Sequence, residues 1–149
     1  MILETKHFGN VEINEEDIVT FERGLPGFED SKRFAILYKV DDDNPFKWLQ
    51  SVDNGSVAFV IVSPQMFKNH YEVKIDDAVA NELDMEDKED VLVYNIVTIP
   101  EDISKMTANL KAPVIINAKK NKGCQIVLEN QQYGFKHSIT EELRNMGVR

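Results

Sequence analysis

The feature that most constrains the fold is a series of short apolar segments, rich in β-branched and aromatic residues, that end at turn-forming residues. Phe34 to Val40 reads FAILYKV, Val57 to Val62 reads VAFVIV, and Val91 to Ile99 reads VLVYNIVTI. Segments of this length and composition favour strands over helices, and many short strands in succession are typical of a barrel or sandwich. The whole chain, residues 1–149, has the length of one domain. We therefore predict a mostly β fold, a small antiparallel β-barrel-like single domain with one or two short helices.

Turn residues predict where the chain reverses. Gly9-Asn10 separates a strand over Ile2–Phe8 from a returning strand over Val11–Ile13, and Asn54-Gly55 favours a tight primed turn before the 57–62 strand. The 57–62 strand is expected to be buried on both faces, because its apolar run is continuous. The other expected strands are Ile18–Phe21, Phe46–Ser51, Pro113–Ala118 and Cys124–Leu128.

Two segments have the pattern of short helices. Asp76–Leu83 (DDAVANEL) places Ala78, Val79 and Leu83 at helical spacing and has acidic residues in its first turn, where the helix dipole favours them. Near the C-terminus, Ser-Ile-Thr-Glu at 138–141 matches a capping box. We expect the second helix over 139–146.

Negative charge is concentrated in the middle of the chain. Residues 72–90 contain nine acidic and two basic residues. This segment is either a solvated face that keeps the protein soluble or a surface that meets a basic protein partner. The candidate protein-binding residues are Asp76, Asp77, Glu82, Asp84, Glu86 and Asp87.

The overall composition excludes several classes of function. Seventeen Lys and Arg against 26 Asp and Glu give a formal net charge of −9, whereas binding to nucleic acid or to an anionic membrane depends on basic residues. No apolar stretch approaches the roughly 20 residues of a membrane span, and the N-terminus has no signal-peptide pattern. The single cysteine, Cys124, allows no internal disulfide. We expect a cytoplasmic protein that contacts neither nucleic acid nor membrane directly.

The most distinctive loop, Gly24–Asp30 (GLPGFED), does not fit a phosphate-binding site. Pro26 removes a backbone donor, and the acidic residues at 29 and 30 would repel a phosphate. We interpret the loop as a turn whose glycines adopt unusual dihedral angles, with Leu25 and Phe28 closing the end of the β core. Asp41–Asn44 lacks the glycine and glutamate of an EF-hand calcium loop and is expected to be a solvated loop.

The residue types that most often carry chemistry form no recognisable constellation. Cys124 lies in an apolar strand, where a buried unreactive thiol is expected, and Trp48 is expected to anchor the core. His7, His70 and His137 lie on separate segments without zinc-ligand spacing. We predict no catalytic residue, no metal site and no cofactor. An enzyme whose site is assembled only in space, around Cys124 or a histidine, is the alternative class.

The order of motifs along the chain is more specific than any single motif. In sequence these motifs are Phe8-Gly9 with Val11-Glu12-Ile13; Phe21 with Gly24-Leu25-Pro26-Gly27-Phe28-Glu29; Trp48-Leu49-Gln50-Ser51; Ala58-Phe59-Val60 with Pro64; Tyr71; Asn109 to Asn117 (NLKAPVIIN); and Gln125-Ile126-Val127-Leu128 with Tyr133. From near the N-terminus to about Ile139, the chain closely resembles FliW, the bacterial flagellar assembly factor family.

The resemblance implies a small, barrel-like, non-enzymatic binding protein. FliW-like proteins bind the translational repressor CsrA and antagonise it, and they also bind newly made flagellin. When flagellin accumulates, it binds the FliW-like protein, and the released CsrA then represses translation of flagellin mRNA. The expected partners are therefore CsrA and flagellin, and a dedicated flagellin chaperone without CsrA antagonism is the alternative. The charge map suggests a mechanism: an acidic segment held beside CsrA would repel RNA without filling its RNA-binding site.

Overall fold

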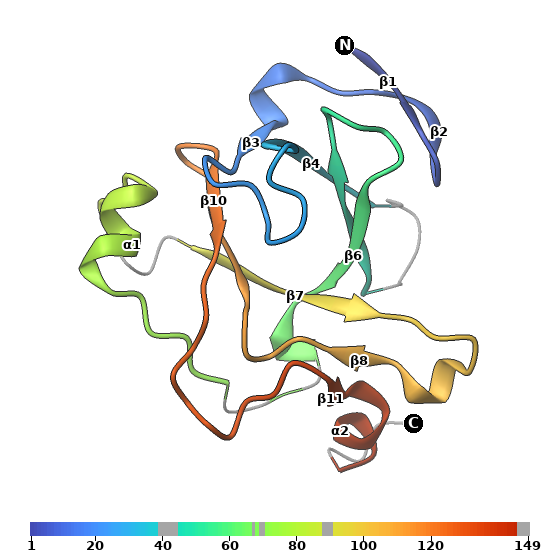
Figure 1. The fold of residues 1–149 in the computed structure, drawn as a ribbon, viewed down its shortest axis with the longest axis vertical. Helices are drawn as coiled ribbons and strands as arrows, with labels where there is room; N and C mark the ends of the chain where they lie inside the picture. Colours follow the sequence, from blue (N-terminus) through green and yellow to red (C-terminus); the bar gives the residue numbers. More distant parts are fainter. Residues whose placement is uncertain (39–44, 67, 69–70, 88–90, 146–149) are drawn as a thin grey trace.

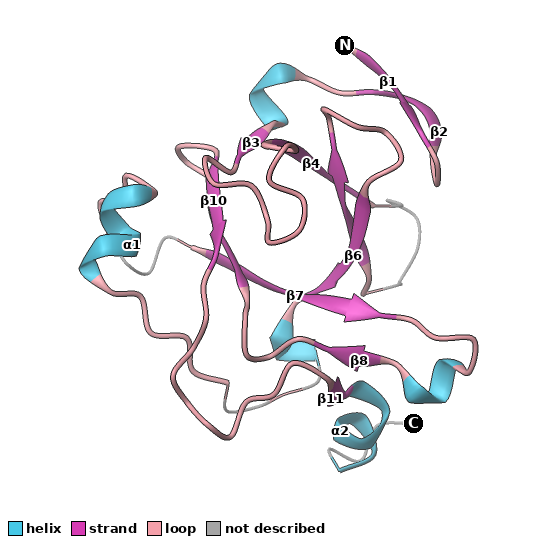
Figure 2. Ribbon diagram, viewed as in Figure 1, coloured by secondary structure: helices cyan, strands magenta, loops and turns pink. Residues whose placement is uncertain are grey.

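Short strands make up most of the regular structure (Figure 2). The computed structural model describes residues 1–38, 45–66, 68, 71–87 and 91–145. Its strands are β1 (Ile2–Thr5), β2 (Gly9–Glu12), β3 (Val19–Thr20), β4 (Arg33–Leu37), β5 (Lys47–Ser51), β6 (Ala58–Val62), β7 (Leu92–Thr98), β8 (Thr107–Ala108), β9 (Val114–Asn117), β10 (Lys122–Gln125) and β11 (His137–Ser138). The helices are α1 (Asp77–Glu82) and α2 (Ile139–Asn145), with the 3-10 turns η1 (Glu15–Asp17), η2 (Pro64–Met66) and η3 (Ile103–Lys105). The predicted mostly β fold class with short helices is confirmed.

Strand β7 closes the sheet into a barrel (Figure 1). The strands follow one another in the order β7, β6, β5, β4, β3, β10 and β9, and β9 pairs again with β7. Every pairing in this ring is antiparallel except that of β10 with β3, where Lys122 lies parallel to Thr20. Beyond its pairing with β9, β7 pairs with β8, which pairs with β11. The predicted antiparallel barrel-like architecture is confirmed.

The barrel encloses one apolar cluster. Its buried members are Val19, Phe21, Leu25, Phe34, Leu49, Ile61, Tyr94, Val114 and Ile116. Phe21 and Phe34 meet edge to face with ring centroids 5.3 Å apart, and a Cβ at Gly123 would lie 2.6 Å from Cζ of Phe21. β10 must therefore carry glycine here so that the Phe21 ring can fill the barrel. A second cluster contains Val62, on the opposite face of β6 from Ile61, so both faces of β6 meet apolar side chains as predicted.

The N-terminal hairpin lies outside the barrel ring and turns earlier than predicted. β1 pairs antiparallel with β2, and the reversal occupies residues 6–8 instead of Gly9-Asn10. The Thr5 hydroxyl fixes this turn, because Oγ1 donates to the Gly9 carbonyl at 2.8 Å and accepts from the Phe8 amide at 2.9 Å. The prediction relied on Gly9 and did not consider Thr5, whose hydroxyl can stabilise a local turn by hydrogen bonding to nearby backbone groups.

Trp48 supports this hairpin from β5. Its ring stacks on His7 with a centroid distance of 4.4 Å and meets Phe8 edge to face at 5.9 Å. The side chain is only partly buried, so the prediction that Trp48 anchors the core is wrong. It forms the platform on which the hairpin turn rests.

The Asn54-Gly55 turn is present, but it is not of the primed type. The Val57 amide donates to the Asn54 carbonyl at 3.0 Å, while Gly55 does not adopt the positive φ that a primed turn requires. Glycine is needed here for space, because an added Cβ would overlap the carbonyl oxygen of Glu4. The close approach of the N-terminal hairpin therefore explains why residue 55 is glycine, whereas the sequence analysis attributed this glycine to the geometry of a primed turn.

The Gly24–Asp30 loop follows the prediction in part. Gly24 and Gly27 have φ values of 64° and 85°, and Leu25 is buried in the barrel cluster. Phe28 is 42% exposed and packs its edge on Phe59 instead of closing the core. The expectation for Phe28 is therefore wrong, since the turn directs this ring to the outside.

Both predicted helices are confirmed. The Asp76 side chain caps α1 by accepting from the Val79 amide at 2.9 Å, and the Ser138 hydroxyl accepts from the Glu141 amide at 3.2 Å before α2. Ala78 is exposed, although the helical pattern placed it on the packed face. The Asp41–Asn44 loop and His70 lie outside the described residues.

Candidate protein-binding surfaces

The acidic surface predicted from the sequence is built on α1 and the turn that follows it. The inner side of this segment is apolar: Leu83 is buried against Ile115 and Cys124, and Val79 packs on the same cluster. Asn117 of β9 donates from Nδ2 to the Leu83 carbonyl at 2.8 Å, which ties the end of α1 to the barrel. The acidic residues are therefore held on a fixed support.

Several of the six predicted residues, among them Asp76, Glu82 and Asp84, are engaged by groups of the same chain. Asp76 caps α1. Glu82 forms an ion pair with Arg23 at 2.8 Å, and Asp84 forms one with Lys122 at 2.6 Å. The hydrogen bond and charge of Lys122 lower the pKa of Asp84, and the same contact raises the pKa of Lys122. Such exposed pairs contribute little to stability, but they reduce the negative charge that this surface presents.

The basic loop at 119–123, which leads from β9 into β10, lies directly beside this surface. Lys119, Lys120 and Asn117 line a shallow depression together with Asp84 and Glu86. The sequence separates these groups by more than thirty residues, whereas the pairing of β9 with β10 brings the loop next to the turn after α1. The outward-facing charge is thus mixed at this end of the segment.

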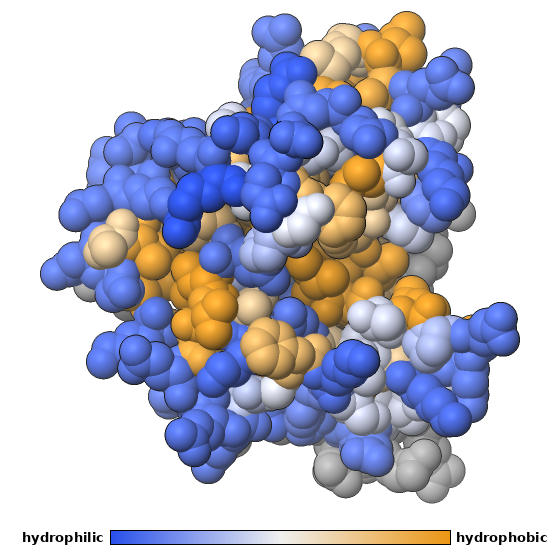
Figure 3. Space-filling view, viewed as in Figure 1, coloured by the Kyte–Doolittle hydropathy of each residue, from blue (hydrophilic) through white to orange (hydrophobic). Residues whose placement is uncertain are grey.

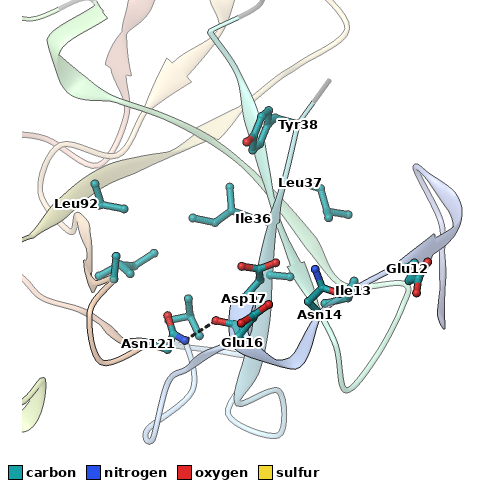
Figure 4. Close-up of a pocket in the computed structure, with 14 residues that line it drawn as sticks. Glu12, Ile13, Asn14, Glu16, Asp17, Ile36, Leu37, Tyr38, Leu92 and Asn121 are labelled. Atoms are coloured by element: carbon teal, nitrogen blue, oxygen red, sulfur yellow. Dashed lines mark hydrogen bonds between the residues drawn. The ribbon is translucent and has the colours of Figure 1, made fainter. Parts of the chain in front are cut away.

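A groove on another face of the molecule was not predicted (Figure 4). It has a volume of about 440 Å³ and runs between the η1 turn and strands β4 and β7. Its apolar lining includes Ile36 and two side chains that are unusually exposed, Tyr38 at 56% and Leu92 at 42%. Its charged lining consists of Glu12, Glu16 and Asp17.

The η1 turn is fixed in place beside this groove. The Asn121 side chain donates from Nδ2 to the Glu16 carbonyl at 2.6 Å (Figure 4), and Asn121 adopts a φ of 53° at the turn between β9 and β10. The groove escaped the sequence analysis because its walls come from segments about 100 residues apart. The acidic run at 15–17 was visible locally, but three acidic residues do not by themselves indicate a groove.

The buried cysteine has the properties of a structural thiol. Cys124 is 4% exposed, and burial raises its pKa to about 12, with the neighbouring Glu82 adding to the effect. A thiol with so high a pKa holds almost no thiolate near neutral pH and is a poor nucleophile. The predicted burial of Cys124 is confirmed, and its raised pKa supports the prediction of low reactivity.

Neither a metal centre nor a membrane span is present in the part of the chain that the structure describes. Among those residues no three His, Cys, Asp or Glu side chains are grouped so that they could hold a metal ion. His137 instead contacts Glu142 at 2.7 Å, and Glu142 also pairs with Lys68 at 2.8 Å. No helix of the described residues is long and apolar enough to cross a bilayer.

Comparison with known proteins assigns the fold and the motif order to one family. The family model described as FliW protein matches residues 2–139. The chain is 52% identical over 145 residues to the flagellar assembly factor FliW of Caldanaerobacter subterraneus subsp. tengcongensis and 51% identical over 145 residues to that of Thermoanaerobacter pseudethanolicus, with 97% of each chain covered in both cases. A crystal structure of the flagellar assembly factor FliW superposes with a TM-score of 0.86 at 38% identity, over 93% of this chain and 96% of that one. The chain belongs to the FliW family of flagellar assembly factors.

Proposed function

We propose that this chain is a cytoplasmic, non-enzymatic binding protein that holds CsrA, antagonises it, and exchanges it for flagellin. Membership of the FliW family is the observation that carries the proposal. The molecule also has the features of a protein-binding module: a rigid closed barrel, a net charge of −9, and acidic residues gathered on fixed supports. An acidic protein of this kind suits a partner that carries positive charge in order to bind RNA.

The acidic segment supplies the mechanism of antagonism. When it lies beside the RNA-binding surface of CsrA, its charges lower the local potential and repel the phosphate backbone without occupying the site. The field comes mainly from acidic residues without a strong ion pair, such as Glu86, because Glu82 and Asp84 are paired with Arg23 and Lys122. RNA itself does not touch this chain.

Binding and exchange are tested together with purified components. The immobilised chain should retain CsrA in the absence of flagellin and release it as flagellin is added. In a gel-shift assay, the chain should block binding of RNA to CsrA, and added flagellin should relieve that block. Retention of flagellin alone, with no binding of CsrA, contradicts the proposal and favours the dedicated flagellin chaperone. Turnover of a small-molecule substrate would contradict the non-enzymatic assignment.

The electrostatic mechanism is tested with charge-reversed variants. Changing Glu86 and Asp87 to Lys should slow association with CsrA and weaken the block on RNA at low salt, and reversing all six predicted acidic residues should do so more strongly. A variant with Glu4 and Glu101 changed to Lys has the same net charge as the double variant but alters exposed residues of β1 and of the segment before η3, so it is the matched control. Equal antagonism by both double variants at low salt would show that the field of the segment is not the cause. The difference should shrink as salt rises, because the screening length is only about 10 Å at 0.1 M.

A further inference from the structure

One strand edge of the barrel is left uncovered below β3. After β10 the chain continues as an extended segment, 126–130, whose Ile126 and Leu128 amides donate to the carbonyls of Pro113 and Lys111 at 3.1 and 2.8 Å. Because successive backbone groups of a strand point to opposite edges, the Val127 N–H and C=O point the other way. They therefore point to the edge opposite β9, which is the edge that pairs with β3 at Lys122.

The Val127 backbone has no partner in the described part of the chain. Among the residues that the structure describes, none forms a hydrogen bond with its N–H or its C=O, and its side chain is 67% exposed. β3 is only two residues long and ends before it reaches this position. Apolar side chains are exposed on this face of the molecule, along the chain that descends from β10 (Figure 3). A strand edge of this kind is a ready template for another strand.

A groove of about 440 Å³ separates this edge from a second extended segment, 72–76. Residues 71–76 alternate between partly buried and exposed side chains, as a strand does, and Val73 and Ile75 pack on the cluster beneath α1. Among the described residues, the backbone of 73–75 makes no hydrogen bond either. The two walls of the groove are therefore both extended backbone, and neither pairs with the other.

The charge of the groove selects its occupant. Glu72, Asp76 and Glu129 line it, against one basic side chain, Lys74. A second copy of this chain would bring the same acidic lining and a net charge of −9 into contact with itself, which like-charge repulsion opposes. A strand with lysine or arginine on one face is attracted instead.

We infer that this groove is a β-addition site, in which an extended, basic segment of a protein partner pairs with the edge at Val127 and places Lys or Arg side chains among Glu72, Asp76 and Glu129. Main-chain hydrogen bonds supply the affinity and the acidic lining supplies the selectivity. The inference does not depend on the partner being CsrA or flagellin.

The probe for this site is a random dodecamer peptide library displayed on phage and selected on the full chain. Enriched peptides should combine β-branched residues with Lys or Arg at alternate positions. A synthetic peptide from the enriched set is then titrated by fluorescence anisotropy. Absence of enrichment, or enrichment of acidic or neutral peptides, overturns the inference.

The variant Val127→Pro removes the N–H that the partner strand needs and breaks no hydrogen bond among the described residues. It should weaken binding of the selected peptide about tenfold or more, since one main-chain bond is lost and the proline ring obstructs the edge. Val127→Ala keeps the N–H and is the matched control, with binding within about threefold of the unsubstituted protein. Glu129→Lys should also weaken binding of a basic peptide. Equal binding by the Pro and Ala variants overturns the inference.

Hydrogen exchange on the unsubstituted chain gives a readout that does not depend on how the Pro variant folds. The Val127 amide should exchange rapidly in the free protein and become protected when the peptide is bound. Unchanged exchange at Val127 in the saturated complex contradicts strand addition. Sedimentation equilibrium tests whether a second copy of this chain occupies the edge instead. Self-association that the Pro variant abolishes would assign the edge to that second copy and overturn the inference of a basic partner.

Discussion

Replacement of Tyr71 by phenylalanine tests how the barrel is joined to the segment that leads into α1. The Tyr71 hydroxyl donates to the Leu110 carbonyl at 2.5 Å and accepts from Asn95 Nδ2 at 3.2 Å. Leu110 and Asn95 are both fully buried. Phenylalanine keeps the ring, which packs on Tyr133 with a centroid distance of 4.8 Å, so the change isolates the hydroxyl group.

The magnitude follows from the groups left behind. The Leu110 carbonyl loses its hydrogen bond from the Tyr71 hydroxyl. A buried polar group that is left without a partner lowers the free energy of unfolding by about 1–3 kcal/mol. Asn95 Nδ2 keeps its bond to the Asn109 carbonyl at 2.9 Å, so the second loss adds only a few tenths of a kcal/mol, roughly. We expect the free energy of unfolding to fall by about 2 kcal/mol, which for a chain of this size lowers Tm by about 4–8 °C.

Urea and thermal unfolding of Tyr71→Phe measure this loss, with Tyr38→Phe as the control. Tyr38 is 56% exposed and is available for the same chemical change on the surface, where the expected effect on Tm is close to zero. A loss below about 0.5 kcal/mol at Tyr71 would refute the reasoning, because it would mean that the buried carbonyl needs no partner.

The alkaline pH dependence provides a second test of the same hydroxyl. Burial raises the pKa of Tyr71 to about 12 in the folded chain, above the value near 10 expected when unfolded. Between these values the folded state holds the proton that the unfolded state has lost, so stability falls as pH rises. This contribution is complete below about pH 10 and disappears through the folded pKa. Phenylalanine cannot ionise, so the stability gap between the two proteins should narrow from pH 10 to 12, and a constant gap would contradict the assigned burial of the hydroxyl.

Three further substitutions or modifications test the packing beneath the proposed surfaces. Gly123→Ala drives a Cβ against the Phe21 ring and should lower the free energy of unfolding by about 1–3 kcal/mol in urea titrations; a neutral effect would show that the ring has room to move. Asn117→Ala removes the bond to the Leu83 carbonyl and should speed amide exchange across α1 while leaving the barrel strands protected; uniform exchange would disprove this local role. Cys124 should resist iodoacetamide at pH 8 in the folded chain and react in denaturant, because burial raises its pKa to about 12; rapid labelling of the folded chain would argue against a buried thiol.

Local patterns predicted the elements of this fold well. The apolar runs at 57–62 and 91–99 correspond to β6 and β7, and the capping box at Ser138 begins α2. Each of these signals depends on residues that are neighbours in the chain. Two errors arose where a distant segment decides the outcome, whereas the early turn of the N-terminal hairpin depends on a local residue, Thr5, that the prediction missed. Gly55 is required because β1 approaches it closely, and Trp48 is placed outside the core because it packs against the turn at His7.

The candidate surfaces were predictable only where the residues are contiguous. The acidic segment 72–90 was visible in the sequence, but the ion pairs of Glu82 with Arg23 and of Asp84 with Lys122 were not, because those pairs span 59 and 38 positions. The groove beside η1 and the free edge at Val127 depend on strand pairing across the whole barrel. A pattern search in one sequence has no access to such contacts.

The architecture separates the candidate binding surfaces from the core that holds the barrel together. The ring is closed by the pairing of β7 with β9 and filled by side chains such as Phe21 and Leu49. Glu86, Val127 and the acidic rim of the η1 groove all lie outside that cluster. Surface substitutions that break no buried contact usually change stability by less than about 0.5 kcal/mol. Side-chain variants at these positions should therefore keep a nearly constant Tm, which allows any loss of binding to be attributed to the surface itself.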